Sequence, residues 1–165
     1  MVKKYRTSLF IFRKDLRLVD NTGLISALAD SDEVIPIFIL TPEQLTKNPY
    51  KSDNCVQFMI ESLVDLNTEL NKHNSKLFLF YGTPARTVND VIKSVPTIDA
   101  IYVNKDYSPY SKERDASIHE ICDKHSINFH SYEDILLNPV GSFKTGSDTI
   151  YEKFPPYFRK AVKSK

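Results

Sequence analysis

Short runs of apolar residues alternate along this chain with longer stretches whose apolar residues recur at helical spacing. The runs are rich in β-branched and aromatic residues, and they predict five strands: Ser8–Phe12, Val34–Leu40, Lys76–Tyr81, Ala100–Asn104 and Asn128–Tyr132. Uninterrupted runs such as "VIPIFIL" (34–40) are typical of parallel strands that are covered on both faces. The alternation of strands and helices therefore predicts an α/β fold, with a doubly wound, five-stranded parallel sheet between two layers of helices.

Helix start signals stand between the predicted strands. An N-cap residue, in two cases followed by proline at the first helical position, opens each of four expected helices: at Asp20 or Asn21, at Ser52 or Asp53, at Thr83-Pro84 and at Ser108-Pro109. The longest connection without predicted structure is Thr41–Lys51. It is long enough that we expect a functional loop there rather than a plain turn.

The alternation ends after Tyr132, where turn residues and aromatics occur without strand or helix periodicity until the last few residues. We therefore expect an α/β domain over residues 1–135 and a C-terminal extension over residues 136–165. The segment "YEKFPPYFRKAVKSK" (151–165) contains five Lys/Arg and one Glu, whereas the whole chain has a formal net charge of only +1. We expect this basic, aromatic end to pack on the domain or to mediate weak self-association.

Composition narrows the classes of protein to which this chain can belong. The net charge argues against a broadly basic nucleic-acid binder, and Cys55 and Cys122 form no motif, which suits a reducing compartment. No stretch has the length of a membrane span or the core of a signal peptide, so we expect a cytoplasmic or nuclear protein that is not secreted and has no membrane partner. The four glycines form neither a G-x-G-x-x-G motif nor a phosphate loop, and the four histidines lack metal-ligand spacing.

Charged and amide residues gather directly after the first and fourth predicted strands. Arg13, Lys14 and Asp15 follow the first strand, and the segment "NKDY" (104–107) ends the fourth. Ligands of open α/β sheets bind beyond the carboxyl ends of the strands, where the strand order reverses. If the reversal falls between these two strands, both clusters flank one crevice.

A second interpretation of the same charges is structural. Arg13 or Arg17 can pair with Asp15, Asp20 or Asp106 and so fix the geometry of the loops, because the planar fork of arginine suits an internal ion pair as well as a ligand. The residue types alone leave both interpretations open.

Five ordered blocks of the sequence carry a specific resemblance. They are "FIFRKDLRLVDNTGL" (10–24), "FMIESLVDLNTEL" (58–70), "LFLFYGTP" (77–84), "VNKDYSPYSKERD" (103–115) and "DTIYEKFPPYF" (148–158). The first is similar to the signature F-R-x-D-L-R-x-x-D-N-x-x-L of the DNA photolyase and cryptochrome family, and the others follow in the family's order. The fourth block is closer to cyclobutane pyrimidine dimer photolyases than to cryptochromes.

The resemblance implies a Rossmann-like antenna domain that binds a light-harvesting pigment: a deazaflavin, a flavin or a folate. In the family, the pigment passes energy to FAD in a separate helical domain, and reduced FAD donates an electron to a pyrimidine dimer. That FAD domain is not among these 165 residues, which also contain no tryptophan. We therefore expect the chain to be non-catalytic alone, and to reach damaged DNA only through an FAD domain in cis or from a second chain.

Two departures from the family pattern bear on the pigment. Cys55 stands where the family commonly has an arginine that can reach the pigment, which weakens the case for an anionic pigment. Tyr110-Ser111 stands where folate-binding members often have Asn-Glu, which disfavours folate. The candidate site combines residues from three strand ends: Arg13, Lys14, Asp15, Leu40, Thr41, Asn104, Lys105 and Asp106.

Two other functions stay open at this stage. A free-standing nucleotide-binding protein, of the stress-protein or electron-transfer-flavoprotein type, has a related topology, but its ATP-binding members need a glycine-rich loop that this chain lacks. An interaction module that has lost its pigment would keep the fold and dock on a partner. The absorbance of the protein from its native source separates bound pigment, bound nucleotide and no ligand.

Overall fold

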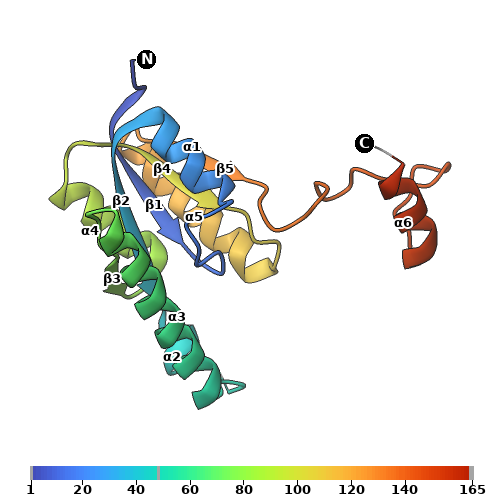
Figure 1. Ribbon diagram of the computed structural model, residues 1–165, viewed down its shortest axis with the longest axis horizontal. Helices are drawn as coiled ribbons and strands as arrows, with labels where there is room; N and C mark the ends of the chain where they lie inside the picture. The colour runs from blue at the N-terminus through green and yellow to red at the C-terminus, as the bar shows by residue number, and fades with distance from the viewer. Residues whose placement is uncertain (1, 48, 164–165) are drawn as a thin grey trace. The chain divides into compact units, whose positions relative to one another are not determined.

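The computed structural model describes residues 2–47 and 49–163, which form two compact units, Met1–Asp134 and Ile135–Lys165. The strands of the first unit are β1 (Tyr5–Phe12), β2 (Ser31–Leu40), β3 (Phe78–Tyr81), β4 (Ile98–Asn104) and β5 (Asn128–Tyr132). Its helices are α1 (Thr22–Asp30), α2 (Pro42–Leu45), α3 (Asp53–Lys72), α4 (Pro84–Ser94) and α5 (Pro109–Lys124). All strand pairs are parallel, in the order β3-β2-β1-β4-β5, which confirms the predicted doubly wound sheet (Figure 1).

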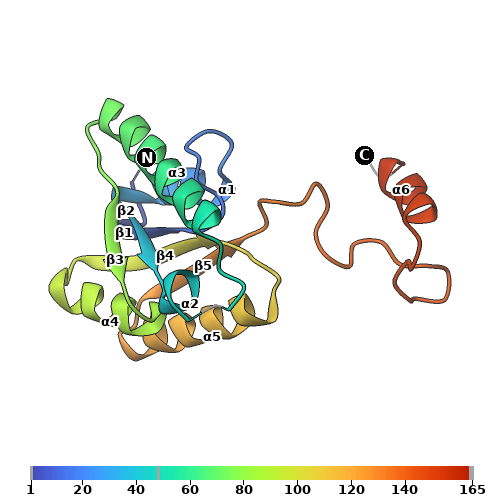
Figure 2. The ribbon, with the colours of Figure 1, turned by 90° about the horizontal axis from the view of Figure 1, so that it is seen from below.

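Helices cover both faces of this sheet, which gives the three layers that the alternation predicted (Figure 2). On one face, α1 and α3 enclose an aromatic-rich core that includes Phe10 and Leu66. On the other face, α4 and α5 enclose an aliphatic core that includes Ile11 and Ile118. Because successive side chains of a strand point to opposite faces, β1 contributes to both cores. Burial on both faces explains why the second half of the strand, residues 9–12, is apolar without interruption.

Pro36 lies inside β2 even though proline removes a hydrogen-bond donor from a sheet. It stands opposite Phe10 of β1, whereas the pairing of β2 with β3 begins only at Ile37. The proline therefore lies where β2 has a partner on one side only.

The prediction of an irregular connection over Thr41–Lys51 is wrong in its first part, where α2 forms. Thr41 caps this helix: its hydroxyl accepts a hydrogen bond from the Gln44 backbone N–H at 3.3 Å, and its own N–H donates to Gln44 Oε1 at 2.9 Å. This is a capping box, which the spacing Thr-x-x-Gln with proline at the first position does signal. Residue 48 of the connection lies outside the described residues.

The second unit contains α6 (Phe154–Val162), which begins earlier than the sequence pattern indicated. Pro155 and Pro156 occupy its first turn, where a missing N–H leaves no hydrogen bond unmade. The ring of Tyr157 contacts three other aromatic rings of this unit, at centroid distances of 5.8, 6.3 and 6.4 Å: those of Phe143, Tyr151 and Phe154. Packing of this segment on the domain, or on a second copy, stays a prediction.

Candidate functional site

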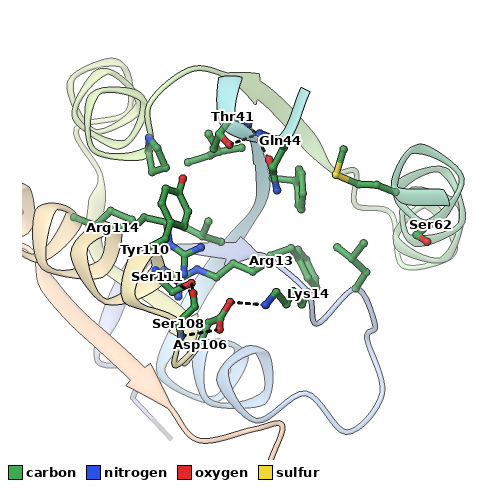
Figure 3. Close-up of a pocket in the computed structure, with 18 of the residues that line it drawn as sticks. Arg13, Lys14, Thr41, Gln44, Ser62, Asp106, Ser108, Tyr110, Ser111 and Arg114 are labelled. Carbon is green, nitrogen blue, oxygen red and sulfur yellow. Dashed lines mark hydrogen bonds and ion pairs between the residues drawn. The ribbon is translucent and has the colours of Figure 1, made fainter. Parts of the chain in front are cut away.

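A cleft of about 480 Å³ opens at the carboxyl ends of β1 and β2, beside the start of α5 (Figure 3). The strand order reverses between β1 and β4, so the cleft lies at the switch point where open α/β sheets bind ligands. Its apolar walls are Ile11, Phe12, Leu16, Phe38, Ile39, Phe58, Met59, Pro84 and Ile118. Its polar lining consists of Arg13, Lys14, Thr41, Gln44, Ser62, Asp106, Ser108, Tyr110, Ser111 and Arg114.

The eight predicted site residues divide into two groups. The cleft is lined by Arg13, Lys14, Thr41 and Asp106, and it is not lined by Asp15, Leu40, Asn104 and Lys105. Leu40 packs against the core beneath α1 and α3. The ammonium of Lys105 pairs instead with the carboxylate of Glu133, with 3.2 Å between Nζ and Oε1. The structure thus brings the ends of β1, β2 and β4 together, but only part of each segment reaches the cleft.

Asp15 and Asn104 are buried and join the loop after β1 to the end of β4. Asp15 Oδ1 accepts a hydrogen bond from the Arg13 backbone N–H at 2.8 Å, and Oδ2 accepts one from Asn104 Nδ2 at 2.6 Å. Asn104 Oδ1 in turn accepts from the Gly23 backbone N–H at 2.9 Å. A Cβ on Gly23 would lie only 2.6 Å from that oxygen, so glycine is required at this close approach. These two predicted site residues fix the geometry of the loop.

Arg13 reaches from the end of β1 to α5. Its Nη1 donates to the Asn104 carbonyl at 3.0 Å and to Asp115 Oδ2 at 2.9 Å, and its Nη2 lies 2.6 Å from Asp115 Oδ1. Burial, together with the nearby charge of Arg114, lowers the pKa of Arg13, and Asp115 opposes this shift. The side chain is only 8% exposed, so Asp115 is the counter-charge that makes its burial tolerable.

The structural interpretation of the charge cluster is confirmed in kind, but the predicted carboxylate partners of the two arginines were wrong; Arg17 contacts Asp20 only through the Asp20 backbone carbonyl. Arg13 pairs with Asp115, and Arg17 Nη2 lies 2.8 Å from Asp134 Oδ2. Asp134 also accepts a hydrogen bond from the backbone N–H of Thr22 at 2.9 Å. Burial raises the pKa of Asp134, but the hydrogen bonds from Thr22 and Arg17 outweigh it, and the net shift is downward. Both acidic partners lie far along the chain, where local patterns do not reveal them.

Lys14 and Asp106 form an ion pair in the wall of the cleft, with 3.0 Å between Nζ and Oδ2 (Figure 3). Burial raises the pKa of Asp106, but hydrogen bonds from Lys14, Ser111 and the Ser108 backbone outweigh it, so that the pKa lies below its usual value. Asp106 is therefore a carboxylate at neutral pH. It fixes the first turn of α5 against the loop that follows β1.

Sequence reasoning missed three side chains that helices bring to the cleft: Phe58 and Met59 from α3 and Arg114 from α5. Tyr110, which the sequence analysis had singled out for its bearing on the pigment, also lines the cleft from α5. Phe58 is 72% exposed and Tyr110 is 45% exposed, so two aromatic rings stand open to solvent at this site. A signal was present, because Tyr110, Arg114 and Ile118 are four residues apart and share one face of the predicted helix.

Two structural features are absent from residues 2–47 and 49–163. No group of three or more His, Cys, Asp or Glu side chains in these ranges is arranged to hold a metal ion. The same ranges contain no helix with the length and apolar character that crossing a bilayer requires.

Comparison with known sequences identifies the family. The sequence model of the DNA photolyase family matches residues 8–165. A deoxyribodipyrimidine photo-lyase from Synechococcus sp. is 28% identical over 151 residues, which are 92% of this chain and 31% of that protein. Cryptochrome DASH from Xenopus laevis is 23% identical, over 96% of this chain and 31% of that protein. The chain thus spans about a third of the length of these curated relatives, whose N-terminal part it matches.

Solved structures agree with the sequence comparison. The archaeal photolyase from Sulfolobus tokodaii, whose crystal structure contains two FAD molecules, is 44% identical with a TM-score of 0.88, over 96% of this chain and 35% of that one. A class III photolyase from Agrobacterium tumefaciens has a TM-score of 0.84 at 24% identity, over 100% of this chain and 33% of that one, and so supports the fold alone. With a family match that covers nearly all of its length, this chain belongs to the DNA photolyase family.

Proposed function

We propose that this chain is the light-harvesting domain of a DNA photolyase-type repair protein, and that the cleft binds its antenna pigment. The chain is non-catalytic alone. A helical FAD domain, in cis or from a second chain, contacts damaged DNA and carries out the light-dependent repair of pyrimidine dimers. Residues 1–135 form the antenna domain in this proposal, and residues 136–165 lead toward the FAD domain.

The observation that carries the proposal is the apolar cleft at the switch point of the sheet. Its volume of about 480 Å³ lies within the usual range of small-molecule sites, which is roughly 300–1,000 Å³. Apolar walls with a few fixed polar groups are also typical of such sites. The exposed rings of Phe58 and Tyr110 suit stacking against a planar, aromatic ligand.

Among the pigments of the family, we favour a flavin over a deazaflavin or a folate. The Sulfolobus tokodaii photolyase, with its two FAD molecules, is described as implying a novel light-harvesting cofactor, and it is 44% identical to this chain. Folate is disfavoured because Tyr110 and Ser111, which line the cleft, replace the Asn-Glu pair of folate-binding members.

Titration of the 165-residue chain with FMN, followed by flavin fluorescence, tests this function. We expect saturable binding at one site, with a dissociation constant of about 1 μM or lower, which corresponds to roughly −8 kcal/mol. A folate should bind more weakly under the same conditions. If no flavin binds, the proposal fails, and saturable binding of ATP instead would favour the nucleotide-binding alternative.

A further inference from the structure

The strand β3 forms one edge of the sheet, and its outer side has no strand partner among residues 2–47 and 49–163 (Figure 2). The Gly82 backbone N–H donates to the Leu40 carbonyl of β2 at 3.0 Å, and backbone groups alternate in direction along a strand. The N–H and C=O groups of Leu79 and Tyr81 therefore point to the open side. Groups of this kind are a template for pairing with another strand.

Apart from its short length, β3 has none of the features that usually keep an edge strand from pairing. Its sequence "FLFY" (78–81) contains no charge and no proline, its pairing with β2 has no bulge, and Leu79 and Tyr81 are 53% and 61% exposed. The open stretch of β2 that precedes this pairing is different. Pro36 lies there, four residues before Leu40 and on the same side of the strand, so the stretch lacks a donor. The chain thus blocks one open stretch of this edge and leaves β3 able to pair.

The two ends of β3 carry opposite charges. Lys76 is the only charged side chain, among the described residues, in the walls of the hollow at the amino end, which Phe78 also lines. The hollow at the carboxyl end is lined by Thr83 and by two carboxylates and one guanidinium, a net charge of −1: those of Glu43, Glu113 and Arg114. A strand with the same charges that ran antiparallel to β3 would place each positive end beside a negative end. A parallel strand would place like charges together.

We propose that β3 pairs with β3 of a second copy of this chain, antiparallel and around a two-fold axis, so that five strands from each copy form one sheet. Leu79 and Tyr81 of each copy supply backbone hydrogen bonds, and the apolar side chains of the two strands meet across the pair. Lys76 of each copy then lies beside Glu43 of the other. This charge match at both ends is the reason that a second copy suits the edge. The inference does not depend on the pigment.

Sedimentation velocity of the wild-type chain, from roughly 1 to 200 μM, tests the pairing. We expect a monomer–dimer equilibrium with a dissociation constant of roughly 10 μM, because strands of four residues bury little surface. Leu79→Lys brings two ammonium groups close to the axis, and it should weaken dimerisation by roughly tenfold or more. Leu28→Lys is the matched control, because Leu28 is 55% exposed and lies on α1, which packs against β1 and β4. It should dimerise as the wild type does.

Charge reversals test the antiparallel order. Lys76→Glu and Glu43→Lys each bring like charges together and should each weaken dimerisation severalfold. The double variant restores opposite charges at both ends, so it should dimerise nearly as the wild type does. The melting temperature of every variant shows whether it is folded.

Three results would overturn the proposal. The first is a wild-type chain that stays monomeric at the highest concentration, which counts whether or not any variant folds. The second is dimerisation of folded Leu79→Lys with the affinity of the wild type, which would place the contact elsewhere, as in the basic C-terminal segment. The third is a double variant that dimerises no better than the two single charge reversals.

Discussion

Replacement of Asp115 by alanine should lower the free energy of unfolding by about 3–5 kcal/mol, the usual effect of removing one partner of a buried ion pair. The carboxylate of Asp115 holds both guanidinium nitrogens of Arg13, at 2.6 and 2.9 Å, and Nε of Arg114 at 3.0 Å. Without it, two guanidinium groups that are 8% and 14% exposed face each other with no shared counter-charge. Since domains are stable by only about 5–15 kcal/mol, the variant should be close to unfolding.

Urea and thermal denaturation measure this effect, and the melting temperature should fall by roughly 10 °C. Asp90→Ala is the matched control, because Asp90 pairs with Arg86 on the exposed surface of α4 at 3.9 Å. Exposed pairs of this kind contribute less than about 1 kcal/mol, so the control should melt near the wild type. If Asp115→Ala also melts near the wild type, Asp115 is not the counter-charge that holds Arg13 in place.

Met59→Trp should weaken the binding of FMN by roughly tenfold or more, which corresponds to about 1.4 kcal/mol of binding free energy. Met59 is half-buried on α3 and lines the cleft. An indole is larger and more rigid than the thioether side chain, so it takes up space that the proposed flavin ring needs. Because the substitution adds volume at the edge of the core, we expect only a modest change of stability.

Val64→Trp provides the control for this substitution. Val64 lies on the same helix, is exposed, and does not line the cleft. It should bind FMN as the wild type does, with a similar melting temperature. FMN affinity that is equal in Met59→Trp, Val64→Trp and the wild type would place the flavin elsewhere.

The centre of the fold was predictable because β1 and β2 are buried on both faces, which makes residues 9–12 and 37–39 continuously apolar. The prediction for Asn128–Tyr132 agrees with β5 to the residue. Predicted bounds were less accurate where a strand extends beyond the apolar run, as at Ser31, where β2 begins. The short helix α2 was missed because four residues are too few to show a periodicity, although its capping signal was present.

The candidate site was predictable only at the strand ends. The switch-point rule applies to chain segments, and it led to Arg13, Lys14, Thr41 and Asp106, which line the cleft. The rule cannot separate these from Asp15 and Asn104, since Thr41 is as buried as those two residues and still lines the cleft. Which face of α3 or α5 turns toward the cleft depends on packing.

The ion pair between Arg13 and Asp115 could not be predicted from the sequence either. Asp115 and Arg13 are 102 positions apart, and no local pattern joins them. The fold brings them together because α5 packs on the face of the sheet to which Ile11, near the end of β1, contributes. The sequence block that contains Asp115 carried the family resemblance, but the resemblance did not state this contact.

Chemical-shift mapping of FMN on the isotope-labelled wild-type chain tests the central claim most directly. We predict that backbone amide perturbations centre on the carboxyl ends of β1 and β2 and on the first two turns of α5, and include Arg13, Lys14, Thr41 and Tyr110. The opposite end of the sheet offers a clear alternative, a hollow between Val34–Pro36 and the segment 71–76 that precedes β3. Perturbations centred on that hollow, at the amino ends of the strands, would contradict the assignment of the cleft as the pigment site.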